Sequence, residues 1–376
     1  MWITDDPRPD AQSGHRLRGL WLGLRPAGVG ARMILTLTPN PTIDRVLFCR
    51  SFRLGEIVRA EREWVIPSGK GVDASLVLQE LGAETRVLGL QAGLNGRLHA
   101  DLLDQWGIAH DMVPALGETR MAIVLIDLLV NAQSTISAPT LTAGEEQLAG
   151  LLESVRRHAR GAWGLICGGS LPPGLPQDTY AGLLRCAHEC GLVTLLDTSG
   201  DALCQGVGGL PDILKVNLSE AQALIESEGG TRSVRLRSFP LLADEAEINL
   251  DQLAGSARFL AAYVGKWARQ AVVVTLGAVG ALAVTREVGY FACPPSVPVV
   301  NTAGAGDALA AGLMLARSRG QDWPDALALG TASAASVVMN QGTAICRREQ
   351  VNDLLAGVRV ERLTKDEGRT TDGVQA

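Results

Sequence analysis

Short apolar runs of strand length alternate with helical patterns along most of the chain, and this alternation most limits what the chain can fold into. Runs such as Ile34–Leu37, Trp163–Cys167 and Val272–Leu276 are almost continuously apolar. Segments between such runs, including Gly144–Arg160 and Ala305–Ser318, repeat apolar residues with helical spacing. Strands that are apolar on both faces and alternate with helices predict an α/β domain, in which helices cover both faces of a parallel sheet.

The early part of the chain departs from this alternation. Strand candidates at Thr42–Phe48, Ile57–Val65 and Met121–Ile136 follow one another with little helix between them. This spacing predicts a small β element, such as a lid, formed by strands within about residues 40–66 and 110–137 and laid against the α/β body. An edge strand of such a lid can pair with a second copy, so we expect a possible homodimer through the lid.

Three segments lack the pattern of a packed domain. Residues 1–32 carry three prolines and five arginines without a periodic apolar face, and we expect a disordered N-terminal extension. Residues 226–250 are polar and charged, which indicates a surface insertion, and residues 364–376 are expected to be a flexible tail. One domain is therefore expected over residues 33–363.

Composition excludes several classes of partner. The 376 residues include 40 acidic and 34 basic side chains, so the net charge of -6 provides no basic surface for nucleic acid or an anionic membrane. No apolar run approaches the roughly 20 residues of a membrane-spanning helix. The seven cysteines show neither a CxxC pair nor zinc-ligand spacing, which favours buried thiols in a reducing cytoplasm.

The strongest site motif is NTAGAGDA at residues 301–308, which leads directly into an apolar-faced helix. Gly304 and Gly306 permit a sharp turn, after which the free N–H groups of the first helical turn can bind a phosphate or a developing oxyanion. Asp307 is an unusual residue for an anion site unless it accepts a proton from an attacking hydroxyl. The alternative is that Asp307 only complements the helix dipole.

A second motif, Asn217-Leu-Ser-Glu220, follows the predicted strand Ile213–Val216. One interpretation is a capping box, in which the Asn and Glu side chains satisfy the first N–H groups of a helix. The other places both side chains at the carboxyl end of a parallel strand, where Glu220 could organise a hydrated Mg²⁺ that carries nucleotide phosphates.

A glycine-rich loop at residues 67–78, PSGKGVDASLVL, marks another helix start. Its spacing is not that of a Walker A motif. Lys70, between Gly69 and Gly71, could bind a substrate phosphate as a point charge. The simpler interpretation is an ordinary helix start with Asp73 as its first-turn acid.

Two further charged residues stand at the ends of predicted lid strands. Asp44, in TPNPTIDRV at 38–46, could accept hydrogen bonds from sugar hydroxyls or could simply face solvent. Arg120, in the GETR sequence at 117–120, is either a bidentate phosphate clamp or an arginine extending into solvent from the sheet end.

Two glycine-containing turns follow predicted strands. The GGSLPPG sequence at 168–174 follows Trp163–Cys167 and marks a fixed turn at a ligand-facing strand end. A tight turn formed by Thr275, Gly277 and Gly280 could pack against a flat base, although a lone Gly-x-x-Gly is weak as a signal.

Taken together, the motifs resemble the PfkB (ribokinase-like) family of carbohydrate kinases, and most closely its branch that includes 1-phosphofructokinase and tagatose-6-phosphate kinase. The resemblance runs from about Met33 to about Val358. The motifs occur in the order of the family: TPNPTID, a GKG loop, GETR, GSLPPG, DTSG, KVNLSE, TLGAVGA and NTAGAGD. This ordered set is far more specific than any of its members and favours the functional interpretation of each.

The resemblance implies a ribokinase-like, Rossmann-type three-layer α/β/α sandwich with a small β lid, and Mg²⁺-dependent phosphoryl transfer from ATP to a sugar hydroxyl. It implies a catalytic group in which Asp307 is the general base and an anion hole is formed by Gly304, Ala305 and Gly306. It also implies that Mg²⁺ is organised by Asn217 and Glu220, and that the nucleotide lies near Thr275, Gly277 and Gly280.

For the acceptor, the resemblance implies a sugar site at Asp44, Gly69, Lys70 and Asp73, with Arg120 holding the existing phosphate. The sequence departs from the family pattern GGKGxN, because Ser68 replaces the first glycine and Asp73 replaces the asparagine that touches sugar hydroxyls. The aspartate loses two N–H donors and adds charge near a phosphorylated substrate, so we expect altered sugar choice or lower affinity.

The expected function is therefore ATP-dependent phosphorylation of a hexose monophosphate to a bisphosphate, similar to that of 1-phosphofructokinase, in the cytoplasm. Tagatose 6-phosphate or fructose 6-phosphate are alternative acceptors. A kinase for an unphosphorylated sugar or nucleoside is disfavoured by Lys70 and Arg120, and a catalytically silent binding protein by Asp307 and Glu220. A nicotinamide oxidoreductase is disfavoured because no GxGxxG follows the first strand.

Overall fold

The computed structural model describes residues 33–130, 132–228 and 250–363 of the chain. The expected extension at 1–32, most of the expected insertion at 226–250 and the expected tail at 364–376 lie outside the described residues. Within the described residues, none of the helices combines the length and the apolar character that crossing a membrane requires.

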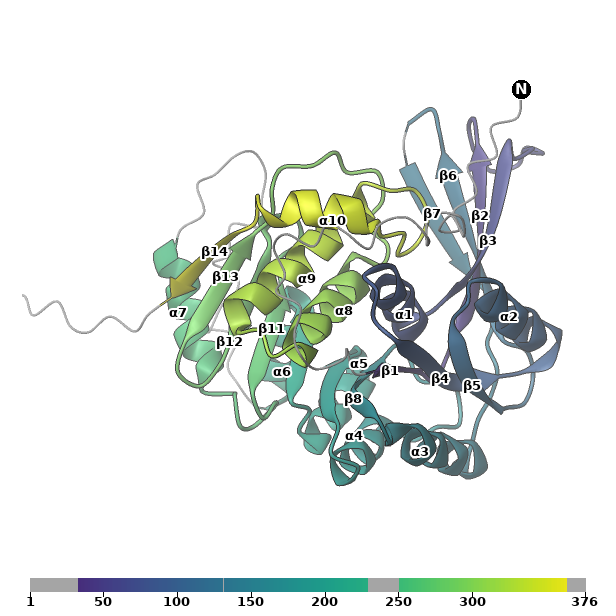
Figure 1. Cartoon of the computed structure of the whole chain (residues 1–376). Coiled ribbons are helices and arrows are strands. Elements are labelled where there is room, and N and C mark those ends of the chain that lie inside the picture. Colours follow the sequence, from purple (N-terminus) through teal and green to yellow (C-terminus); the bar gives the residue numbers. More distant parts are fainter. Residues whose placement is uncertain (1–32, 131, 229–249, 364–376) are drawn as a thin grey trace, which may run out of the picture.

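A ten-stranded sheet forms the centre of the molecule, in the order β14-β13-β12-β11-β10-β9-β8-β1-β4-β5 (Figure 1). From β5 to β11 every neighbouring pair is parallel. These strands are β1 (Met33–Thr38), β4 (Thr85–Gln91), β5 (Ala109–Pro114), β8 (Ala162–Gly168), β9 (Val193–Asp197), β10 (Ile213–Asn217) and β11 (Ala271–Thr275).

The prediction of an entirely parallel sheet is wrong for the last three strands. Strands β12 (Ala281–Val284), β13 (Gly289–Cys293) and β14 (Arg359–Leu363) each pair antiparallel with the preceding strand in the sheet. Only residues 276–280 separate β11 from β12. A connection this short can form a hairpin but cannot return the chain for a parallel pairing.

Helices cover both faces of this sheet, which makes the three-layer α/β/α sandwich that the sequence predicts. One apolar cluster joins the sheet to α3 (Glu145–Ala159), α4 (Thr179–Glu189), α5 (Gly200–Gly206), α6 (Leu218–Ser227) and α7 (Leu250–Ala261). A second cluster joins the opposite face to α1 (Lys70–Glu80), α8 (Ala305–Ser318), α9 (Trp323–Val338) and α10 (Arg348–Leu355).

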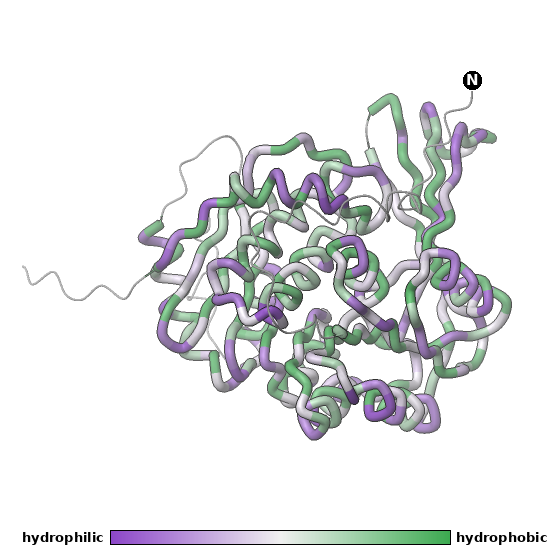
Figure 2. Tube along the Cα trace, viewed as in Figure 1, coloured by the Kyte–Doolittle hydropathy of each residue, from purple (hydrophilic) through white to green (hydrophobic). Residues whose placement is uncertain are grey.

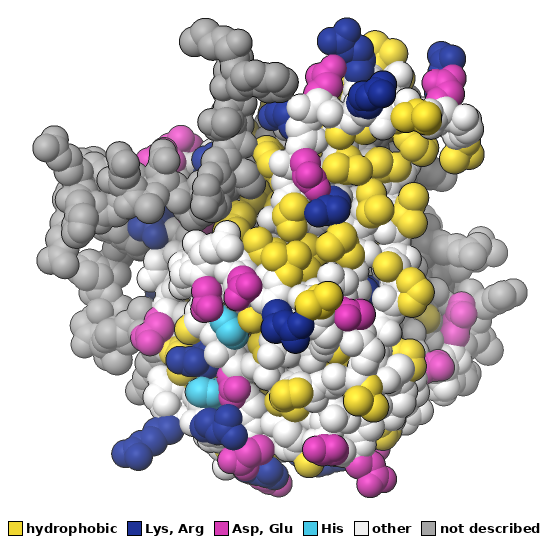
Figure 3. Space-filling model, turned by 90° about the vertical axis from the view of Figure 1, so that its right-hand side faces the viewer, with side chains coloured by type: hydrophobic (Ala, Val, Ile, Leu, Met, Phe, Trp, Pro, Cys, Tyr) yellow, Lys and Arg dark blue, Asp and Glu magenta, His cyan; other side chains and the backbone are white. Residues whose placement is uncertain are grey.

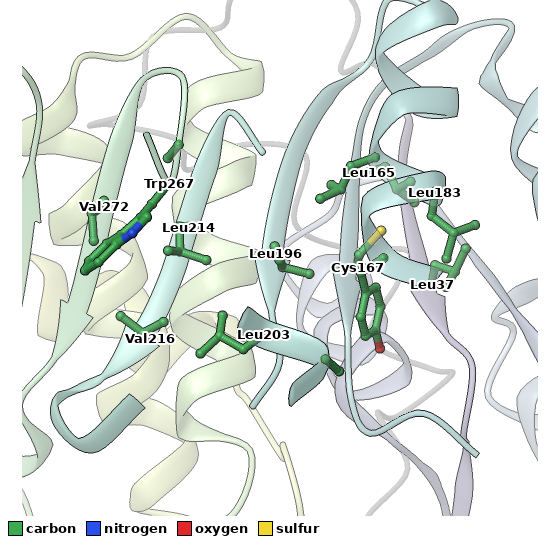
Figure 4. Close-up of a cluster of buried hydrophobic side chains, with 14 of the residues drawn as sticks. Leu37, Leu165, Cys167, Leu183, Leu196, Leu203, Leu214, Val216, Trp267 and Val272 are labelled. Carbon is green, nitrogen blue, oxygen red and sulfur yellow. The ribbon is translucent and has the colours of Figure 1, made fainter. Parts of the chain in front are cut away.

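The strand sequences explain why both faces are buried. In β1, Leu35 and Leu37 belong to the first cluster while Ile34 belongs to the second, because successive side chains of a strand point to opposite faces. Figure 4 shows Leu37 and Cys167 of neighbouring strands beside Leu183 of α4. Figure 2 shows the strands of the central sheet as largely hydrophobic.

A second sheet of four strands stands beside the large one, in the order β3-β2-β6-β7. Its strands are β2 (Thr42–Cys49), β3 (Arg62–Ser68), β6 (Arg120–Asp127) and β7 (Ala132–Ser137). We call this sheet the lid. The region expected to supply its later strands begins too early, because residues 110–114 belong to β5 and pair with β4 in the large sheet.

The lid is packed on the body through a small apolar core of its own. Val46 and Phe48 of β2 and Val124 of β6 contact Ile345 of the body and Leu103 of α2 (Gly93–Gln105). Because the lid contributes one side of this core, its inner face is held over the end of the large sheet where β1 meets the start of α1.

Candidate active site

The carboxyl ends of the parallel strands meet along one edge of the large sheet. In the strand register, Gly168 of β8 lies beside Asp197 of β9, and Asn217 of β10 lies beside Thr275 of β11. Ligands of open α/β sheets bind outside this edge. The sequence motifs at 197–200, 215–220 and 275–277 are therefore brought to one place, although they are far apart in the chain.

The GKG loop reaches the same edge because its glycines let α1 begin directly against β1. The Gly71 N–H donates to Thr38 Oγ1 at 2.6 Å. A Cβ atom at residue 71 would lie 2.5 Å from that oxygen and 3.0 Å from the Leu37 backbone, so no larger residue fits. This close approach places Lys70 and Asp73, in the first turn of α1, at the carboxyl edge.

The loop before α8 is fixed by a neighbouring segment. The Asn301 side-chain amide donates to the Gly342 carbonyl at 2.7 Å, and the Ala344 N–H donates to the Ala303 carbonyl at 3.2 Å. Gly304 has a φ of 83°, and a Cβ there would lie 2.6 Å from the Ala344 nitrogen. Glycine is therefore required at this position for both conformation and space.

The first turn of α8 has the free donors that an anion site needs, with one difference from expectation. Among the described residues, the N–H groups of Gly306 and Asp307 have no acceptor, whereas the Ala305 N–H donates to the Thr302 carbonyl at 3.3 Å. Of the three residues expected to form the anion hole, Ala305 thus has its donor already engaged.

Four charged side chains from four different elements meet behind this turn. Lys70 Nζ lies 3.1 Å from Asp197 Oδ1 and 3.5 Å from Asp307 Oδ1, and Lys215 Nζ lies 2.6 Å from Asp197 Oδ2. Asp197, Lys215 and Asp307 are buried. We call these four residues the ion cluster.

Burial and mutual attraction set the protonation states of the ion cluster. For Asp197, burial raises the pKa, but Lys215 and Lys70 lower it more, so the net shift is downward and this carboxylate is ionised. For Lys70, burial lowers the pKa, but Asp197 and Asp307 raise it further, so the ammonium is retained. For Asp307, burial raises the pKa above its usual value, and Lys70 offsets only part of that. A carboxyl group with a raised pKa is suited to accept a proton near neutral pH.

A second group of polar residues joins the lid to the body. Thr343 Oγ1 donates to Asp44 Oδ2 at 2.8 Å, and the Arg120 Nη2 group donates to the Asn40 carbonyl at 3.3 Å. Arg120 is half-buried, and its Nε atom is buried without a partner within the described chain. Burial raises the pKa of Asp44, although hydrogen bonds from Thr343 and Ser68 and the charge of Arg120 oppose this shift.

The two cations expected to share one phosphate therefore have different partners. Lys70 is bound to Asp197 and Asp307, whereas Arg120 faces Asp44 and Asn40. Among the described residues, the Arg120 guanidinium therefore donates only to the Asn40 backbone carbonyl, whereas Lys70 is engaged by two carboxylates.

Asn217 and Glu220 form the capping box that the sequence allows. Asn217 Oδ1 accepts from the Glu220 N–H at 2.9 Å, and Glu220 Oε2 accepts from the Asn217 N–H at 2.8 Å. The Glu220 charge also contributes to the raised pKa of Lys70, after the larger effects of Asp197 and Asp307. Its Oε1 atom has no partner among the described residues, and no group of three or more acidic, His or Cys side chains there could hold a metal ion.

This donor set still fits Mg²⁺, because that ion is commonly held by one or two carboxylates, with waters and substrate phosphates as the remaining ligands. Across the sheet, Thr275 ends β11, and the turn Gly277–Val279 follows it. Gly277 faces open space, whereas a Cβ at Gly280 would meet the Ala292 carbonyl. The structure thus explains Gly280 by its close approach to β13, and it leaves the space beside Gly277 open.

Three residues of the site were missed from the sequence: Asp197, Lys215 and Thr343. For the first two a signal exists, because Lys215 is a charge inside an otherwise apolar strand and Asp197 ends the strand beside it. For Thr343 no local signal exists, because its partner Asp44 is 299 positions away in the chain.

The chain is similar in sequence and in fold to known sugar kinases. The pfkB family carbohydrate kinase model matches residues 39–350. The chain is 29% identical over 333 residues to a 1-phosphofructokinase of Rhodobacter capsulatus, covering 88% of this chain and 98% of that protein. It is 28% identical over 324 residues to an ATP-dependent 6-phosphofructokinase isozyme 2 of Mycobacterium tuberculosis, covering 86% of this chain and 88% of that protein. The structure of phosphofructokinase-2 of Escherichia coli in complex with potassium superposes with a TM-score of 0.74 at 24% identity. The match covers 87% of this chain and 99% of that chain. That last similarity confirms the expected fold.

The ion cluster leads to a prediction about stability. Lys215→Met leaves the buried Asp197 carboxylate with Lys70 alone, so we expect the free energy of unfolding at pH 7 to fall by about 3–5 kcal/mol. The deficit should shrink as the pH falls through the lowered pKa of Asp197, because a protonated Asp197 needs no cation. Denaturant unfolding between pH 3 and pH 8 measures both effects.

The matched control is Lys266→Met, which removes a largely exposed lysine paired with Glu228. An exposed pair contributes less than about 1 kcal/mol. Equal losses in the two variants would mean that the ion cluster does not carry the stability assigned to it.

Proposed function

We propose that this chain, which belongs to the pfkB family of carbohydrate kinases, transfers a phosphoryl group from ATP to a hydroxyl group of a hexose monophosphate. The observation that carries the proposal is Asp307, buried with a raised pKa at the start of α8, beside a lysine and two free backbone N–H groups. The names of the two relatives, a 1-phosphofructokinase and an ATP-dependent 6-phosphofructokinase, support a phosphorylated hexose as acceptor.

In this mechanism Asp307 accepts the proton of the attacking hydroxyl. Lys70 Nζ lies 3.5 Å from Asp307 Oδ1 and holds that carboxylate in place, while burial keeps its affinity for a proton above that of an exposed aspartate. The free N–H groups of Gly306 and Asp307 lie where the helix dipole is positive, so they stabilise negative charge on the transferring phosphoryl group.

The nucleotide lies along the carboxyl edge, near Thr275 and Gly277. Glu220 and Asn217 would hold a hydrated Mg²⁺, which would supply positive charge to neutralise the nucleotide phosphates. The capping box fixes the Glu220 carboxylate at the head of α6 while leaving Oε1 available. Most of the catalysis then comes from positioning and electrostatics, as in other phosphoryl transfers.

The acceptor lies between the lid and α1. Arg120 binds its existing phosphate, because the exposed part of a half-buried guanidinium can form charge-assisted bonds to a dianion. Asp44 accepts hydrogen bonds from sugar hydroxyls with its Oδ1, since Oδ2 is engaged by Thr343. Fructose 1-phosphate is the first acceptor to test, and fructose 6-phosphate and tagatose 6-phosphate are the alternatives.

A test of the catalytic base is Asp307→Asn, which keeps the size of the side chain but cannot accept the proton. We expect kcat to fall by roughly 10²–10⁴ while nucleotide binding survives. Asp325→Asn, in the first turn of α9, is the matched control and should leave kcat unchanged. Near-normal turnover of the Asp307→Asn enzyme would reject the assignment.

A test of the acceptor class is Arg120→Ala. We expect kcat/KM for fructose 1-phosphate to fall by roughly 10²–10³, which corresponds to about 3–4 kcal/mol, while any weak activity on free fructose barely changes. Arg120→Lys should recover part of the loss, because an ammonium lacks the bidentate geometry. Arg45→Ala, which removes an exposed arginine of the same lid, is the control. Equal damage to both acceptors would make Arg120 a structural residue.

We also propose that two copies associate through the outer face of the lid. In the strand register, Ile136 of β7 lies beside Ile123 of β6, and neither belongs to the core under the lid. Leu47, Val65 and Leu125 lie on the same outward face. Figure 3 shows hydrophobic side chains gathered on the upper part of this side of the molecule. An apolar sheet face of this kind is a typical association surface.

Sedimentation tests this association. We expect the wild-type chain to form a dimer at micromolar concentration, and Ile136→Lys to raise the dimer Kd at least tenfold by placing a charge in an apolar interface. Leu94→Lys, at an exposed position on α2, is the control and should not alter the Kd. A wild-type chain that remains monomeric throughout would contradict the proposal.

A further inference from the structure

We infer that Asp73 acts as a neutral carboxylic acid, which donates a hydrogen bond from its carboxyl group to an oxygen atom of the bound acceptor. The inference deepens the proposed function and, for its activity test, rests on it. It makes Asp73 a specificity-determining residue, because a protonated carboxyl group recognises an acceptor oxygen where an ionised one recognises a hydroxyl or an ammonium group.

The first observation is an unsatisfied buried oxygen. Asp73 is 5% exposed, in the first turn of α1. Its Oδ2 atom accepts only a long hydrogen bond of 3.4 Å from Ser68 Oγ, and its Oδ1 atom is buried with no partner among the described residues. A buried ionised carboxylate normally accepts several hydrogen bonds, because it otherwise loses the solvation it had in water.

The second observation is the charge around Asp73. Asp307 at the start of α8 and Asp44 on β2 both disfavour a further negative charge at this position. The hydrogen bond from Ser68 and the charge of Lys70, in the same helical turn as Asp73, favour one. The ammonium of Lys70 is already shared between Asp197 and Asp307, and Arg120 faces Asp44. Ser68 of β3 contributes only a hydroxyl group.

An ionised Asp73 would therefore be a carboxylate with too few cations and too few donors. Burial, followed by Asp307 and Asp44, raises the pKa of Asp73 well above its usual range. A bound phosphorylated acceptor would add negative charge nearby and favour the neutral form further. Protonation supplies one O–H donor on a carboxyl group whose Oδ1 atom has no other partner among the described residues.

The activity test compares the wild type with Asp73→Asn and Asp73→Ala, using fructose 1-phosphate from pH 6 to pH 10. If the neutral form binds the acceptor, wild-type kcat/KM falls about tenfold for each pH unit above the pKa of Asp73. Asp73→Asn carries amide donors at all pH values, so it should lack this alkaline loss, and its advantage over the wild type should grow as the pH rises. Asp73→Ala, without a donor, should lose at least tenfold at pH 6.

The opposite pattern would overturn the inference. If Asp73→Asn shows the same alkaline loss as the wild type, or loses at least tenfold at pH 6, then the ionised carboxylate is the working form. Asn restores a hydrogen-bond donor at position 73 and Ala does not. Activity at pH 6 that survives in Asp73→Asn but not in Asp73→Ala therefore indicates a contact with the acceptor and not a purely structural role.

Stability provides a readout that needs no substrate. When folding raises the pKa of a group, the folded state keeps its proton to a higher pH than the unfolded state does. The free energy of unfolding therefore falls as the pH rises from the unfolded pKa to the folded pKa. Tm should therefore be equal in the wild type and Asp73→Asn near pH 4, and the variant should become the more stable of the two as the pH rises. Asp201→Asn, at an exposed first-turn acid of α5, is the control.

The activity and Tm measurements distinguish a failure of the neutral Asp73 from a failure of the proposed kinase function. A rising Tm difference without turnover of any hexose phosphate would leave Asp73 neutral and reject the proposed function. A Tm difference that does not change with pH would reject the neutral Asp73, whatever the enzyme phosphorylates.

Discussion

The whole site depends on an ion cluster that is costly to bury. Lys70, Asp197, Lys215 and Asp307 come from α1, β9, β10 and α8, and together they carry two positive and two negative charges. Moving such charges out of water costs free energy. Their mutual attraction offsets this cost only when each charge has a close partner in favourable geometry. Because each element supplies one partner, the cluster ties the glycine loop, two central strands and the anion-binding helix into one arrangement, and it also sets the properties of the Asp307 carboxyl group.

A second constraint joins the lid to the loop that precedes α8. The segment from Gln341 to Ile345 accepts a hydrogen bond from Arg62 of β3, donates one to Asp44 of β2 through Thr343, and places Ile345 in the core under the lid. The same segment binds Asn301 and Ala303 on its other side. Lid position and the geometry of the phosphoryl site are thus linked by direct contacts.

Much of this could be predicted from the sequence, because the signals were local. Continuous apolar strands predicted the layers, and the order of the glycine motifs predicted which residues gather at the carboxyl edge. The predictions failed where contacts between residues far apart in the chain determine the strand pairing. The antiparallel pairing from β11 to β14 replaced the expected parallel pairing, and residues 110–114 joined the large sheet instead of the lid.

The central claim is that the acceptor is a phosphorylated hexose held between the lid and α1. The most direct measurement is ADP release from ATP across a panel of free sugars, nucleosides and sugar monophosphates, with kcat/KM determined for each. The account predicts that a hexose monophosphate is preferred over its unphosphorylated sugar by at least about 10², the amount assigned to the phosphate contact. A wild-type enzyme that prefers the free sugar or a nucleoside would contradict it.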